Sequence, residues 1–204
     1  MKRCRNCKSL KLINLFSLGN MSFTGKFPKS RRTDIKKTEL SLVICSKCSL
    51  VQLNKNYNLK YLYNPDYGYR TGINKTMTKH MNDIKKTLSY KSKLISGDYV
   101  LDIASNDATL LNYYNENIIK VGIDPLVNKF IKYYKKIDYK ISDFFPSSKI
   151  IKKIKNKFKI ITALSVFYDA KDPNQFLKDV NKLLREDGIF LLEQADLLSI
   201  LKLK

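Results

Sequence analysis

Short apolar runs alternate with amphipathic segments through the second half of the chain. Runs that predict buried strands cover residues 99–104, 119–124, 138–142, 158–164 and 188–193. Segments with helical spacing of apolar residues lie between and after them, at 108–117, 126–135, 147–155, 173–185 and from 196 to the end. Strands that alternate with helices predict a parallel sheet with helices on both faces. Ligands of such sheets gather outside the carboxyl ends of the strands.

The first part of the chain has a different pattern. The segment LKLINLFSLG and the polar stretch TGKFPKSRRTD are expected to form a loop, and SLVICSKCSLVQL then predicts a strand, a pair of cysteines and a second strand. The only four cysteines form two CxxC pairs, Cys4 with Cys7 and Cys45 with Cys48. In a chain without an export signal this spacing predicts a closed, structural Cys4 zinc site, with disulfides or free thiols as the less favoured alternative. Because the segment has few apolar groups, we expect the metal to supply much of its stability.

The stretch YVLDIASNDATLL, from Tyr99 to Leu111, predicts a buried strand, a turn of small polar residues and a helix. A second strand in KVGID brings Asp124 to the same edge about 20 residues after Asp102. This order is the first half of a nucleotide-binding βαβ unit. Two acids are therefore expected at the ends of two neighbouring parallel strands.

The turn in this stretch disfavours a phosphate-bearing cofactor. Dinucleotide sites use glycines so that backbone amides can approach a pyrophosphate. Here Ala104, Asn106 and Ala108 hold the glycine places, and Asp107 is expected to put a negative charge where phosphates would lie. S-adenosylmethionine (SAM) carries no phosphate and has a sulfonium and an ammonium group, which carboxylates attract. We expect Asp124 to accept the ribose hydroxyls.

The motifs VLDIASNDATLL, GIDP, ITALSVFYD and FLLEQADLL, preceded by the CxxC pairs and YGYRTG, resemble the class I methyltransferases that carry an N-terminal zinc-binding domain. The resemblance implies a Rossmann-like SAM-binding domain. It also implies an activity similar to that of sugar C-methyltransferases, which act on nucleotide-linked keto-deoxysugars. Such a function would belong to deoxysugar biosynthesis.

The resemblance and the positions at strand ends together indicate the site residues. The tyrosine-rich passage LKYLYNPDYGYRTGI is expected either to pack between domains or to cover the cofactor, and Thr71 stands where the family has serine. By analogy with the fold, Asp143 would accept from the adenine amino group and Phe144 would pack near the ring. The expected cofactor-binding residues are Tyr69, Thr71, Gly72, Asp102, Ala104, Ser105, Asn106, Asp107, Leu110, Asp124, Pro125, Asp143, Phe144 and Ser165. The catalytic candidates are Tyr168, Asp169 and Glu193.

A catalytic base is harder to find. Methylation of a carbon requires a group that removes a proton next to a carbonyl. The family places a Glu and His pair for this end of the site beyond the fifth strand, and no matching residues occur before Lys204. His80, the only histidine, is expected to be a packed or surface residue of a helix from residue 75 toward 91.

These patterns divide the chain into a zinc module at 1–57, a tyrosine-rich linker and helix at 58–95, and a partial SAM-binding domain at 96–204. The family implies two further strands after the fifth. We therefore expect the sequence to be part of a longer protein, with feeble turnover or none by this part alone.

The formal net charge of +21 comes almost entirely from lysine and has several interpretations. Compositional bias explains most of it, and the dense run KIIKKIKNKFK is read as a solvated helix face more readily than as a polyanion patch. The alternatives to small-molecule methylation are an RNA methyltransferase and a non-catalytic SAM-binding protein. Without a signal peptide or a long apolar run, we expect a cytoplasmic protein with no membrane partner.

Overall fold

The computed structural model describes residues 3–22, 30 and 35–202. The chain divides into two compact units, one formed by residues 1–69 with 171–174 and the other by residues 70–170 with 175–204. The polar stretch TGKFPKSRRTD lies outside the described residues except for Ser30.

The first unit contains a three-stranded antiparallel sheet in the order β1-β2-β3. Its strands are β1 (Leu12–Ser22), β2 (Lys37–Cys45) and β3 (Val51–Leu53). Along β2 the side chains of Ser41, Val43 and Cys45 are buried, as expected for alternate residues on one face of a strand. The predicted arrangement of strand, cysteine pair and strand is therefore confirmed.

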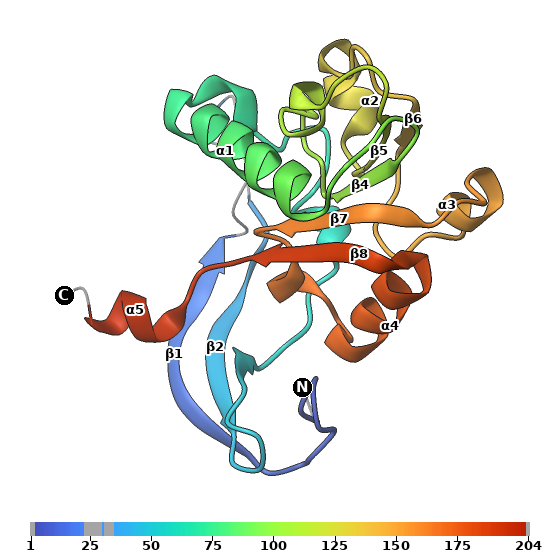
Figure 1. Cartoon of the computed structure of the whole chain (residues 1–204). Helices are drawn as coiled ribbons and strands as arrows, with labels where there is room; N and C mark the ends of the chain where they lie inside the picture. Colours follow the sequence, from blue (N-terminus) through green and yellow to red (C-terminus); the bar gives the residue numbers. More distant parts are fainter. Residues whose placement is uncertain (1–2, 23–29, 31–34, 203–204) are drawn as a thin grey trace. The chain divides into compact units, whose positions relative to one another are not determined.

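The second unit contains a five-stranded sheet in the order β6-β5-β4-β7-β8, in which every pair is parallel (Figure 1). Its strands are β4 (Tyr99–Ile103), β5 (Ile119–Ile123), β6 (Tyr139–Ile141), β7 (Phe158–Leu164) and β8 (Leu184–Glu193). The predicted α/β class is confirmed. Only β8 differs in more than an end residue, because it begins at Leu184 and contains an irregularity before Ile189 pairs with Ile160.

The helices agree with the sequence less well than the strands. The amphipathic helix α1 (Lys75–Lys91) begins where Asn74 accepts hydrogen bonds from the first-turn N–H groups of Thr76 and Met77. The later helices α3 (Ser148–Lys153), α4 (Pro173–Leu183) and α5 (Leu197–Lys202) also fall in predicted segments. The segment 126–135 is shorter than expected, with α2 (Val127–Phe130) followed by a 3-10 turn at Ile131–Tyr133.

The predicted helix at 108–117 is wrong. Only a 3-10 turn, Leu111–Tyr113, forms there. The reason lies in the preceding turn, where Ala104, Asn106 and Ala108 have φ of 59°, 49° and 59°. Left-handed residues cannot continue a right-handed helix, so no helix can begin before Thr109.

Two layers cover the sheet of the second unit. Leu101 and Ile103 of β4 belong to a core shared with Ile150 of α3 and Phe176 of α4. Since successive strand residues face opposite sides, Asp102 faces the other layer. Figure 1 shows α1 and α4 on opposite sides of β7 and β8.

The left-handed turn leads to a stability prediction. In this left-handed conformation alanine is about 1–2 kcal/mol less favourable than glycine. Glycine loses about 0.5–1 kcal/mol of this advantage because its unfolded state has more conformational entropy. We expect Ala104→Gly to raise the free energy of unfolding by about 0.5–1 kcal/mol in urea titrations. Ala163→Gly, at a fully buried position of β7 without positive φ, should lower it. A loss of stability in both variants would contradict the strain at Ala104.

Candidate functional site

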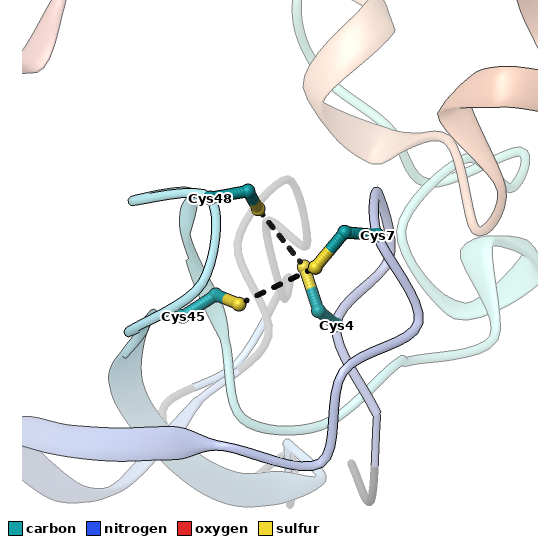
Figure 2. Close-up of side chains that lie close together, drawn as sticks. All are labelled: Cys4, Cys7, Cys45 and Cys48. Atoms are coloured by element: carbon teal, nitrogen blue, oxygen red, sulfur yellow. Dashed lines mark hydrogen bonds between the residues drawn. The ribbon is translucent and has the colours of Figure 1, made fainter.

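The four cysteines of the first unit converge on one point (Figure 2). Their sulfur atoms all lie within 4.8 Å of one another, with 3.6 Å between Cys4 and Cys48 and 3.5 Å between Cys7 and Cys45. A tetrahedral Zn²⁺ ion with Zn–S bonds of about 2.3 Å holds its sulfurs about 3.8 Å apart. The cluster therefore fits a four-coordinate zinc ion, and with four thiolates it would leave no open position for a substrate.

The two CxxC turns have the same backbone. In the second, the N–H of Cys45 donates to the carbonyl of Leu50, and the carbonyl of Cys45 accepts from the N–H of Ser49, whose φ is 58°. In the first, the N–H of Cys4 donates to the carbonyl of Ser9, and the carbonyl of Cys4 accepts from the N–H of Lys8, which also has a positive φ. The equivalence shows that both pairs are built as metal knuckles.

Backbone amides favour the thiolate form that zinc requires. Burial raises the pKa of the Cys45 thiol, but hydrogen bonds from the backbone N–H groups of Cys48 and Lys47 outweigh burial and lower this pKa to about 6. The N–H of Leu50 lowers the pKa of Cys48 in the same way. The thiolate form is thus favoured at Cys45 and Cys48, whereas at Cys7 the Ser9 backbone hydrogen bond is outweighed by burial and the neighbouring thiols, which raise its pKa to about 11.

In the second unit, the carboxyl ends of the parallel strands meet at one edge of the sheet. Ile103 pairs with Ile123, and Ile123 pairs with Ile141. On the other side of β4, Ile103 pairs with Ala163, and Leu164 of β7 pairs with Glu193. The segments that follow these strands therefore start side by side, as the sequence predicted.

The turn after β4 uses its backbone N–H groups within the protein. Those of Ala104 and Ser105 donate to the carbonyl of Ile123, at 2.8 and 3.2 Å. The N–H of Asn106 donates to the Asp124 carboxylate at 3.0 Å. The N–H groups of Ala108 and Thr109 donate to the Ser105 carbonyl and the Asp107 carboxylate. Five amides that could otherwise cradle a phosphate are already paired.

The segment before α1 is fastened to this turn. The side-chain oxygen of Asn106 accepts from the N–H of Thr71 at 2.9 Å. Asp107 accepts from the N–H of Gly72 and from the Arg70 guanidinium, both at 2.9 Å. A Cβ at Gly72 would lie 2.6 Å from the Asp107 carboxylate, so only glycine fits. Thr71 and Gly72, expected to bind the cofactor, thus contact the turn, whereas Tyr69 belongs to the first unit.

The Asp107 carboxylate, which the sequence was expected to place at the turn as a negative charge, is paired within the protein. It is only 1% exposed and pairs with the Arg70 guanidinium. That guanidinium also stacks on the Tyr133 ring, 4.2 Å from its centroid. Asp107 therefore acts as a fastening point for residues 70–72.

The side chain of Tyr134 supports the turn after β4. Its hydroxyl donates to the Asn106 carbonyl at 2.8 Å and lies 2.8 Å from the Ser105 hydroxyl. The ring packs so closely on Gly122 that a Cβ there would lie 2.9 Å from it. Tyr134 is a supporting residue that the sequence analysis missed.

Asp102 is buried within the sheet. Thr162 donates its hydroxyl to the Asp102 carboxylate at 2.7 Å. Burial raises the pKa of Asp102 to about 7, against the Thr162 hydrogen bond and with a smaller contribution from the Asp124 charge. A buried acid of this kind shapes the base of the turn.

Asp124 follows β5 and reaches the turn with one oxygen. Its other oxygen accepts from the N–H of Leu126 at 2.6 Å. Burial raises the pKa of Asp124 to about 6, although the N–H groups of Leu126 and Asn106 oppose this. Each carboxylate oxygen has two lone pairs, so both can still accept from a ligand hydroxyl.

The remaining predicted positions lie in the segments after β4 to β8. Leu110 is buried, and the Pro125 carbonyl accepts from Ser142. Desolvation raises the pKa of Asp143, but hydrogen bonds from Ser147 and the N–H of Phe144, with the Lys149 ammonium, hold it below its usual value.

The segment after β7 carries two of the three catalytic candidates. Ser165 has a left-handed φ of 53°, and its N–H donates to the Glu193 carbonyl at 2.7 Å. Tyr168 and Asp169 lie in the 3-10 turn Phe167–Asp169, where Tyr168 is half-exposed. Both side chains follow the carboxyl end of β7, and their catalytic role stays a prediction.

The third catalytic candidate, Glu193, has a partner from a distant element. Its carboxylate lies 2.7 Å from Nε2 of His80 on α1. His80 was expected to be a packed or surface residue. Neither the sequence spacing nor its neighbours on the helix indicated this contact.

Comparisons with known proteins agree with both units. Residues 4–63 match the model of the Methyltransf_13 zinc-binding domain. No curated protein matches the chain by sequence. The N-terminal unit therefore carries a four-cysteine zinc-binding cluster of a recognised kind.

Solved structures with the same fold are methyltransferases. The plantazolicin methyltransferase BpumL, in complex with a pentazolic desmethylPZN analog and SAH, matches with a TM-score of 0.50 and 17% identity over 63% of this chain and 51% of that one. A SAM-dependent methyltransferase from Clostridium acetobutylicum ATCC 824 matches with a TM-score of 0.43 and 19% identity over 56% and 49%. The second unit has a Rossmann-like methyltransferase fold. The chain spans about half the length of these structures.

Within the described ranges, every helix is too short or too polar to cross a bilayer.

The cysteine cluster predicts a metal-dependent fold. We expect one Co²⁺ ion per chain to give the intense visible absorption of tetrahedral thiolate coordination, with Zn²⁺ displacing it. Cys45→Ser should lose this absorption and lower the melting temperature of the first unit, because a ligand is removed. Ser46→Ala, an exposed neighbour, should change neither. Octahedral cobalt spectra in the native chain would contradict the site.

The buried carboxyl of Asp102 predicts a pH-dependent stability difference. Its folded pKa, about 7, exceeds the unfolded value, so the folded state holds the proton more tightly and ionisation destabilises it as pH rises from about 4 to about 7. Asp102→Asn should match the wild type in unfolding free energy near pH 4 and exceed it near pH 7.5 by an amount on the order of a few kcal/mol. An unchanged difference across this range, measured by urea titration, would refute the buried neutral acid.

Proposed function

We propose that the second unit binds S-adenosylmethionine at the carboxyl edge of its sheet and that the protein is a SAM-dependent methyltransferase for a small molecule. One observation carries the choice of cofactor. The turn after β4, where a dinucleotide would place its pyrophosphate, has five of its N–H groups paired within the protein.

A second feature of the turn supports the same choice. Phosphates bind where a helix begins, because its free amides and dipole favour an anion. Here a 3-10 turn of three residues, Leu111–Tyr113, replaces that helix. A cofactor without phosphate loses nothing at such a turn.

The proposed contacts of SAM follow from the side chains at the edge. Asp124 accepts the ribose hydroxyls through the lone pairs that the backbone leaves free. Asp143 accepts from the adenine amino group, and Phe144 packs near the ring. The segment 70–72, fastened to Asn106 and Asp107, lies beside the methionine end. Ser165 and Tyr168 contribute from the neighbouring strand end.

For the acceptor, we propose a nucleotide-linked keto-deoxysugar. The order of motifs, with a zinc-binding module before the Rossmann-like domain, supports this class. The formal net charge of +21 would favour capture of an anionic nucleotide sugar. The zinc ion would be structural, and the chemistry would occur at the sheet edge.

The acceptor is tested by transfer of labelled methyl groups from SAM to a panel of nucleotide-linked keto-deoxysugars, with total RNA as competitor. Incorporation into the sugar supports the proposal. Incorporation into RNA instead identifies an RNA methyltransferase, and SAM binding without transfer to either identifies a cofactor-binding protein.

The cofactor is tested by calorimetry. Ribose hydroxyls donate to the ionised carboxylate, so we expect SAM affinity to rise about tenfold between pH 5 and pH 7.5 as Asp124, with a pKa of about 6, loses its proton. Asp124→Asn should bind more weakly with no such dependence, and Asp187→Asn, whose parent carboxylate pairs with Lys159, should behave as the wild type.

Two results would overturn the cofactor proposal. One is binding of NAD⁺ in preference to SAM by the wild-type chain. The other is failure of the wild-type chain to bind SAM at either pH, whereas a SAM affinity that does not change with pH contradicts only the contact with Asp124. The second readout stands even if Asp124→Asn fails to fold.

A further inference from the structure

The contact between His80 and Glu193 joins two distant parts of the second unit. Nε2 of the imidazole lies 2.7 Å from a carboxylate oxygen, and the side chains are 41% and 37% exposed. Both groups are therefore partly shielded and still open to a ligand. An exposed ion pair of this kind adds little stability, about 0–1 kcal/mol, so stability alone gives a weak reason for it.

The pair lies at the edge where the cofactor is proposed to bind. Glu193 is the last residue of β8 and pairs with Leu164 at the carboxyl end of β7. His80 is in the second turn of α1, about 9 Å along the helix axis from the cap Asn74. The segment just before that cap is fastened to the turn after β4. One end of α1 is thus anchored at the cofactor turn while its next turn reaches the β8 strand end.

The hydrogen bond fixes the chemistry of the imidazole. A carboxylate can only accept, so Nε2 carries the hydrogen, and in the neutral ring Nδ1 holds a lone pair. Within the described part of the chain, no residue is found in a hydrogen bond with Nδ1. A carboxylate that orients an imidazole and stabilises its protonated form is the arrangement of a general base.

We propose that His80 is the general base that prepares a carbon acceptor for methylation and that Glu193 is its positioning residue. This inference rests on the proposed function. It assigns the base that the sequence analysis could not find.

The proposed reaction moves one proton to His80 and one methyl group to the acceptor carbon. Nδ1 of His80 takes a proton from the carbon next to the acceptor's carbonyl, and the C–H electron pair forms the enolate. The enolate carbon attacks the methyl group, a C–C bond forms, and the C–S electron pair returns to sulfur. The sulfonium becomes a neutral thioether, Glu193 stabilises the imidazolium, and His80 later releases the proton to water.

The geometry is tested first without any acceptor. Since His80 is the only histidine, ¹⁵N-histidine labelling of the full chain gives a single imidazole. We expect the Nε2–H tautomer in neutral protein. Glu193→Ala should produce a mixture of tautomers, whereas Glu193→Gln, which keeps an acceptor oxygen, should retain it. A wild-type Nδ1–H tautomer would overturn the proposal.

The chemistry is tested by proton exchange, which needs no methyl transfer. Full-length protein with S-adenosylhomocysteine and dTDP-4-keto-6-deoxyglucose in D₂O should incorporate deuterium beside the carbonyl. His80→Gln should slow this exchange at least about a hundredfold, the usual contribution of a general base. Glu193→Gln should fall between the two, and Lys79→Gln, an exposed neighbour, should match the wild type.

The outcomes separate the two proposals. Unchanged exchange in His80→Gln, with SAM affinity intact, overturns the base assignment alone. Wild-type protein that binds SAM but neither exchanges nor methylates the sugar overturns the proposed acceptor together with the base assignment. Failure to bind SAM overturns the proposed function instead.

Discussion

Backbone amides cannot be left unpaired when they are removed from water, and this constraint governs the turn after β4. The turn meets it internally, through the Ile123 carbonyl, the Ser105 carbonyl and two carboxylates. Three left-handed residues, Ala104, Asn106 and Ala108, aim the amides at these acceptors. The strain is stored where the ligand is proposed to bind, as is common at functional sites.

The same turn organises its surroundings. Asn106 and Asp107 hold residues 70–72, and this fastening sets where α1 begins. The start of α1 in turn brings His80 to Glu193. The backbone conformation of this one turn therefore influences the position of the residues proposed to carry out the chemistry. The cysteine cluster belongs to the other unit, and we expect a bound zinc ion to supply much of the stability of that unit.

Strands β2 to β7, the cysteine cluster and α1 could be predicted because their signals are local, whereas the segment of β1 was expected to lie in a loop. Apolar runs mark β4 to β7 to within a residue of their ends, and Asn74 followed by helical spacing marks α1. The missing helix at 108–117 could not be seen, because its segment has helical spacing and only the φ values of the turn exclude it.

The partners of the site residues were not predictable, because they come from residues far apart in the chain. Arg70 and Asp107 are separated by 37 positions, and His80 and Glu193 by 113. A lone histidine among methionines carries no sign of a carboxylate on another element. The supporting role of Tyr134 was equally hard to predict, because it depends on the absence of a side chain at Gly122. Sequence patterns locate strand ends well, but they do not show which side chains meet there.

The central claim is that five of the six backbone amides at residues 104–109 are paired within the protein and are therefore not available to a phosphate. Hydrogen exchange of the individual backbone amides at residues 104–109, followed by NMR in the free protein, tests this most directly. We predict that the amides of Ala104, Ser105, Asn106, Ala108 and Thr109 exchange slowly before any ligand is added and that NAD⁺ leaves them unchanged. Rapid exchange in the free protein, suppressed by NAD⁺ or another diphosphate, would contradict the account.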